Sequence, residues 1–79
     1  MLSIGDTITI EFENENQENI IAKSKVSSIE ENVLRVHYPV DVETGRTIII
    51  PTNTIAMIHF VNKQQDLYKF TSVIQGRDI

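Results

Sequence analysis

The chain has 79 residues, of which 41% are hydrophobic, and it contains no cysteine. A chain of this length forms one small domain, so we expect residues 1–79 to be a single domain with a modest core. The lack of cysteine excludes disulfides and cysteine nucleophiles, and it favours a cytoplasmic location. Eleven acidic against seven basic residues give a net charge of −4, which argues against nucleic-acid binding, and no apolar run is long enough for membrane insertion.

Polar and apolar residues alternate along the first half of the chain at the two-residue period of half-buried strands. Residues 7–13 form the clearest strand, and the polar residues 14–19 that follow predict a hairpin loop. A second strand is expected over residues 20–29, with a bulge near residues 27–28 because Ile29 falls out of phase. After a tight turn, a third strand is expected over residues 33–38.

The second half of the chain predicts three more strands. Pairing is expected to end or become an edge at Pro39, and Gly45 is the natural residue for a positive φ in the next turn. The β-branched residues 47–51 predict a short strand buried on both faces, and residues 55–61, apolar in both phases, a central strand. With a last strand over residues 67–75, the pattern predicts an all-β fold, a small antiparallel six-stranded split β-barrel.

A contiguous core is expected from the side chains in the apolar phase of each strand. These side chains are Ile8, Ile10, Phe12, Val26, Leu34, Val36, Tyr38, Ile58, Phe60, Phe70 and Ile74.

Residues suited to catalysis are few and unfavourably spaced. His37 and His59 form no ligand-spaced pair, so we assign them structural roles rather than a metal or base role. Glu11 and Glu13 share a strand face, which is the minimum for a pair of catalytic carboxylates, but that face is the polar one and is interpreted as solvated surface. No serine or glycine pattern indicates a nucleophile or a phosphate-binding loop. We therefore predict that the chain is not an enzyme and has no catalytic, metal-binding or cofactor-binding residue.

One connection has a more distinctive composition. Residues 38–41 (Tyr-Pro-Val-Asp) and 44–47 (Thr-Gly-Arg-Thr) place an aromatic ring, a rigid kink, a flexible turn and an arginine together. This predicts that Gly45 and Arg46 form a partner-contact site that presents the arginine to an anionic group, because loops often carry binding residues. The alternative is a turn that only joins two strands.

The order of several short motifs resembles the amino-terminal domain, PilZN, of YcgR-like PilZ proteins, especially those of Gram-positive flagellated bacteria. The motifs are Ile4-Gly5-Asp6, an acidic hairpin, the two segments at 38–41 and 44–47, Phe60-Val61 and Tyr68-Lys69-Phe70, and the resemblance covers nearly the whole chain. It implies a compact β-barrel in the cytoplasm and a role in braking the flagellar motor when cyclic di-GMP is high. It also implies two partners, the chain's own PilZ domain and a flagellar motor or stator protein.

The family's nucleotide-binding motifs, an arginine-rich linker and Asp/Asn-x-Ser-x-x-Gly, belong to the PilZ domain and do not occur in these residues. The resemblance therefore implies that this chain is a piece of a longer protein and that cyclic di-GMP binds only where the PilZ domain is present. The family's last strand would follow Gly76, so we also expect an uncovered strand edge and a possible dimer through it. The alternative function is a free-standing small barrel that binds RNA or a peptide at a sheet edge.

Overall fold

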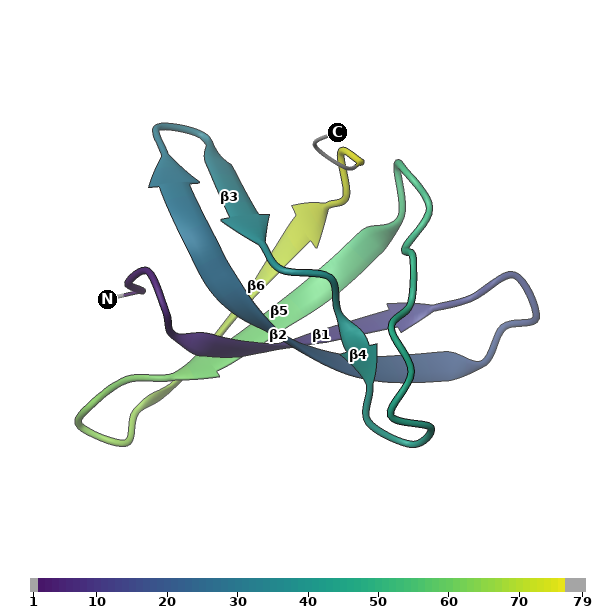
Figure 1. Ribbon diagram of the computed structural model, residues 1–79, viewed down its shortest axis with the longest axis horizontal. Coiled ribbons are helices and arrows are strands. Elements are labelled where there is room, and N and C mark those ends of the chain that lie inside the picture. The colour runs from purple at the N-terminus through teal and green to yellow at the C-terminus, as the bar shows by residue number, and fades with distance from the viewer. Residues whose placement is uncertain (1, 77–79) are drawn as a thin grey trace.

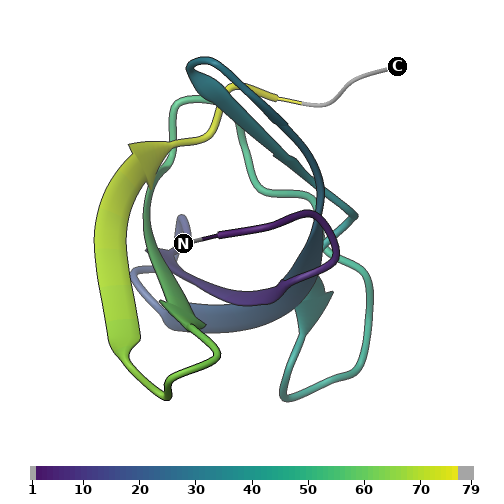
Figure 2. The same ribbon diagram turned by 90° about the vertical axis from the view of Figure 1, so that its left-hand side faces the viewer.

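The structure, a computed structural model, describes residues 2–76 and contains no helix within them. Its strands are β1 (Thr7–Glu13), β2 (Asn19–Glu30), β3 (Val33–Val36), β4 (Val40–Asp41), β5 (Ile55–Val61) and β6 (Leu67–Val73). They form one antiparallel sheet in the order β3-β2-β1-β5-β6, with β4 paired to β2 beside this path (Figure 1). Figure 2 shows that the sheet curls into a half-barrel around the core, which confirms the predicted all-β split-barrel class.

The β1–β2 hairpin has the register that its alternating pattern predicts. Every residue of β1 is paired, from Thr7 opposite Lys25 to Glu13 opposite Asn19. In the turn, the Asn14 side-chain oxygen accepts hydrogen bonds from the backbone N–H groups of residues 16 and 18, each at 2.9 Å. Asparagine side chains stabilise turns in this way, so the polar loop at residues 14–19 is confirmed.

The predicted bulge in β2 is present. The β2–β3 register shifts between Val26 and Ser28, and beyond this point β2 pairs with β3 instead of β1. The bulge bends the long strand, so that its second half turns out of the plane of the first (Figure 1). Ile29 nevertheless remains exposed, because it lies near the tip of the hairpin, opposite Leu34 and beyond the core.

The predicted third strand is too long by two residues. β3 ends at Val36, and Tyr38, expected in the core, is 55% exposed. Pro39 has no N–H to donate, which interrupts the ladder as expected. The chain then rejoins the sheet, because Val40 and Asp41 pair as the edge strand β4 with β2.

The prediction of a doubly buried strand over residues 47–51 is wrong. Thr47 forms only an isolated bridge with Val40, and the rest of the segment is irregular. Ile50 is buried and Ile48 packs against the core, whereas Ile49 projects outward. The segment is therefore held by alternate side chains in the core and by a few backbone contacts at its start, such as the Ile48 N–H donating to the Pro39 carbonyl, and not by a full ladder.

The core lies on the inner side of the curled sheet. Its buried apolar residues are Ile8, Ile10, Phe12, Ala22, Val26, Ile50, Ala56 and Ile58. Of the other predicted members, Leu34, Val36, Phe60 and Ile74 pack against this cluster while partly exposed. Besides Tyr38, the one clear error is Phe70, which is 38% exposed on the edge strand β6.

β5 is central in the sheet order, as predicted, but it is not buried on both faces. Ala56 and Ile58 point into the core, whereas Ile55, Met57 and Val61 lie exposed on the other side. We call that side, which the outward-pointing residues of β1, β2, β5 and β6 share, the outer face. Exposed apolar residues on a central strand mean that the outer face is not ordinary polar surface.

Candidate interaction surfaces

The turn after β4 is built by its own backbone. The Gly45 N–H donates to the Asp41 carbonyl at 2.8 Å, and the Asp41 N–H donates to the Arg46 carbonyl at 2.9 Å. The Asp41 carboxylate accepts the Glu43 N–H, and the Val42 N–H holds the turn to β2 by donating to Ile21. Gly45 has φ of +72°, as the sequence predicts.

Arg46 lies exposed on this turn. Within residues 2–76, no hydrogen bond or ion pair involves its side chain. Its guanidinium is therefore accessible to an anionic group. The structure thus places Gly45 and Arg46 together at an exposed turn. Their role as partner-contact residues stays a prediction.

Replacing Gly45 by alanine should lower the free energy of unfolding by about 1–2 kcal/mol, because an alanine resists the left-handed conformation. No atom lies within 4 Å of the added Cβ, so the cost is conformational and not steric. Gly45→Asn is the matched control, since asparagine tolerates this conformation, and urea unfolding of the two variants measures the difference. Equal losses for both variants would contradict a conformational origin.

β6 is an edge strand with little cover on either face. Leu67 and Val73 are exposed on the outer face, and Tyr68 and Phe70 are exposed on the inner one. Phe60 of β5 stacks on Tyr68 with ring centroids 5.2 Å apart and meets Phe70 edge-on at 6.4 Å. β6 therefore combines an unpaired ladder edge in the described structure with an open aromatic cluster.

We predict that this edge makes the chain self-associate, because exposed strand edges pair with one another. Sedimentation velocity over a range of concentrations should show a dimer that is lost in Thr71→Lys, where like charges at residues 69 and 71 would oppose edge pairing. Asn16→Lys, in the β1–β2 loop, is the control for added charge. A species that stays monomeric at high concentration would contradict the prediction.

Of the residues considered for catalysis, the structure brings only His59 and Glu11 close together. His37 follows β3, whereas His59 lies on β5 with its Nε2 3.2 Å from Glu11 Oε1, close but not aligned as a hydrogen bond. The other Glu11 oxygen accepts the Asn19 amide at 2.9 Å, and Glu13 is exposed. Within residues 2–76, no three His, Asp or Glu side chains are grouped to hold a metal ion. The arrangement is a close contact between one histidine and one carboxylate, and the structural roles assigned to these residues stay a prediction.

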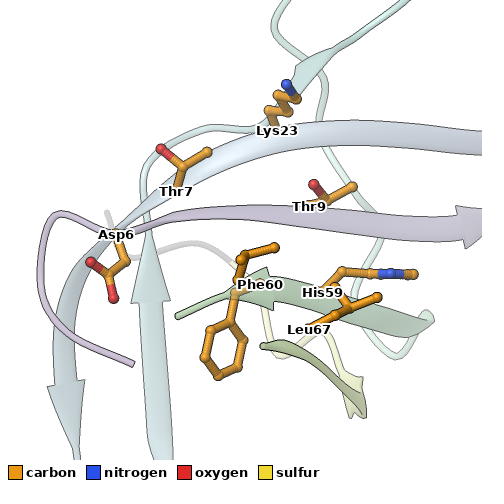
Figure 3. A pocket seen from close by; sticks show the side chains of 8 residues that line it. Asp6, Thr7, Thr9, Lys23, His59, Phe60 and Leu67 are labelled. Carbon is orange, nitrogen blue, oxygen red and sulfur yellow. The ribbon is translucent and has the colours of Figure 1, made fainter. Parts of the chain in front are cut away.

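An open hollow of ≈ 350 Å³ lies where β1 and β5 separate. The two strands pair only over residues 9–11 and 57–59, so the start of β1 diverges from the end of β5. Figure 3 shows Thr7, Thr9 and Lys23 projecting to one side of the sheet and Phe60 to the other. The hollow is thus a gap in the sheet whose outer rim has polar side chains, such as Thr9 and Lys23, and the apolar side chains of Val61 and Leu67.

These features define a small curled β-sheet domain whose distinctive parts are surfaces. No helix among the described residues is long and apolar enough to cross a membrane. The family model described as flagellar protein YcgR, PilZNR, matches residues 3–79. The chain therefore belongs to this family, which confirms the resemblance to the amino-terminal domain of YcgR-like proteins.

Two matches from Bacillus subtilis, one to a protein sequence and one to a solved structure, illustrate the relationship. The uncharacterized protein YpfA of strain 168 is 43% identical over 77 residues, which make up 98% of this chain and 35% of that protein. The solved structure of the inhibitor of motility MotI/DgrA matches with a TM-score of 0.87 and 43% identity, over 96% of this chain and 36% of that one. The chain thus spans about a third of the length of these relatives.

Proposed function

We propose that this chain is a regulatory contact domain of a cyclic di-GMP receptor that controls flagellar motility in the cytoplasm. The observation that carries the proposal is the 0.87 TM-score, at 43% identity, to a protein described as an inhibitor of motility. The family is described by a flagellar protein and by no reaction, which is consistent with a non-enzymatic role. Its partners would be its own PilZ domain and a component of the motor, such as the stator.

The mechanism we propose is positional. Cyclic di-GMP held by the PilZ domain would change the angle between the two domains and so expose or hide a surface of this one. Such a switch requires contacts that differ between the two states, because a ligand shifts an equilibrium only through differential interactions. The turn at Gly45–Arg46 and the uncovered strand β6 are the surfaces available for those contacts.

The alternative, an RNA-binding barrel, is disfavoured by the placement of aromatic and basic side chains. Single-stranded RNA is held by aromatic rings and cations that converge on one groove. In β6, Lys69 alternates with Tyr68 and Phe70, so its ammonium group and their rings lie on opposite faces of the sheet. The net charge of −4 opposes phosphate binding further.

A domain replacement tests the proposed function. The corresponding domain of MotI is exchanged for residues 1–79, and swimming speed is measured in cells with raised cyclic di-GMP. We expect the chimera to slow swimming as MotI does, whereas MotI without the domain should not. Full speed with a chimera that is stable and still binds cyclic di-GMP would overturn the proposal.

A further inference from the structure

The strand register places three lysines, Lys23, Lys25 and Lys69, along one row of the outer face. Lys23 of β2 is paired with Thr9 of β1, Thr9 with His59 of β5, and His59 with Lys69 of β6. These four residues form a row across four neighbouring strands, and Lys25 follows Lys23 on the same side. We call Lys23, Lys25, Thr9, His59 and Lys69 the basic row.

The lysines of the basic row have no acidic partner in the described part of the chain. No carboxylate lies within ion-pair distance of Lys23, Lys25 or Lys69 there, although acids outnumber bases by eleven to seven in the sequence. The nearby Glu11 instead accepts a hydrogen bond from the Asn19 amide, and its other oxygen lies 3.2 Å from His59 Nε2. Three lysines on one face of an acidic domain are therefore not paired with any carboxylate of the described residues.

Exposed apolar side chains flank the basic row. Val61 and Leu67 are a cross-strand pair next to His59 and Lys69, and they are 55% and 57% exposed. Met57 borders the row on its other side, also exposed. Exposed apolar side chains beside unpaired charges can both bury area and pair charge with a partner, which a purely solvated face does not offer.

We propose that the basic row and its apolar neighbours dock a protein segment that carries carboxylates beside apolar side chains. Strands lie about 4.8 Å apart, so Lys23 and Lys69, separated by three such intervals, would receive carboxylates roughly 14 Å apart. Complementary charge sets the partner and its orientation, while the apolar neighbours add buried area. A nucleic acid fits less well, because the exposed aromatic rings of β6 lie on the inner face.

The inference rests on the proposed function only in assuming that the domain acts by contact with a partner. Its test therefore uses the 79-residue chain without any motor protein. A library of random displayed peptides is selected on the chain, and the dissociation constants of the enriched peptides are measured. We expect acidic peptides with apolar residues, whose binding weakens at least about tenfold in Lys23→Glu/Lys69→Glu and in high salt. Lys63→Glu, half of that charge change in the β5–β6 loop, should alter binding less than about twofold.

Each other outcome would overturn the inference. The outer face does not dock such a segment if the selected peptides are neutral or basic, or if no peptide is enriched. The same holds if acidic peptides bind the double variant as tightly as the original chain. Binding of a fluorescent uridine oligonucleotide that the double variant abolishes would assign the basic row to nucleic acid instead. Unchanged thermal unfolding of each variant shows that binding, and not folding, is compared. A chimera that fails to slow swimming while peptide binding persists would count against the proposed function alone.

Discussion

Replacing Ile10 by alanine is expected to lower the free energy of unfolding by about 2–5 kcal/mol. Ile10 is 2% exposed and lies in the middle of the sheet, between Ala22 of β2 and Ile58 of β5. The substitution removes buried methyl groups and leaves a cavity that the surrounding strands cannot fully close. Because a domain of this size has only a few kcal/mol of stability, urea unfolding should show a large fall or complete unfolding.

The matched control is the same substitution at an exposed isoleucine. Ile55 lies on β5 with its side chain on the outer face, 67% exposed. Ile55→Ala should change the free energy of unfolding by no more than about 0.5 kcal/mol. Comparable losses at the two positions would mean that the inner and outer faces of the sheet are wrongly assigned.

The 79-residue chain alone is expected to show no saturable binding of cyclic di-GMP by calorimetric titration. Tight capture of two phosphates and two guanines calls for several arginines that converge on the nucleotide. Arg35 lies 3.3 Å from Glu30 beside the β2–β3 turn, Arg46 lies on the turn after β4, and Arg77 lies outside the described residues. Among the described residues this leaves one arginine on β3 and one on the turn after β4, which are too few for a convergent clamp.

The MotI chimera serves as the positive control for this titration, because the proposed function places the nucleotide site outside the exchanged domain. It should bind with a single saturable isotherm under the same conditions. Saturable low-micromolar binding by the 79-residue chain alone, a free energy of about −8 kcal/mol, would contradict the prediction. It would place at least part of the nucleotide site within this domain.

Local sequence pattern was enough to predict most of the sheet. The strict alternation of β1 determines which side chains enter the core, and the change of phase at Ile29 correctly located the bulge. The errors share a physical cause, since apolar character does not say whether anything covers a side chain. Residues 47–51 resemble a buried strand, yet they have no full ladder partner. Phe70 is apolar, but it lies on a strand that nothing covers within the described chain.

The candidate surfaces were predictable to different degrees. The turn with Gly45 at positive φ follows from neighbouring residues and is confirmed as a turn. The basic row could not be predicted in the same way, because Lys23 and Lys69 become neighbours of one face only through the register of four strands. A search for lysines at the polar positions of consecutive strands, taken as paired neighbours, would have suggested part of the basic row.

The most direct test of the contact function is where the chimera is located in the cell. A fluorescent fusion of MotI in which residues 1–79 replace its own domain is imaged together with labelled flagellar motors. The predicted result, at raised cyclic di-GMP, is fluorescence concentrated at the motors in the chimera and spread through the cell when the domain is deleted. Diffuse fluorescence of the intact chimera in cells whose swimming is nevertheless slowed would contradict a function exercised by contact with the motor.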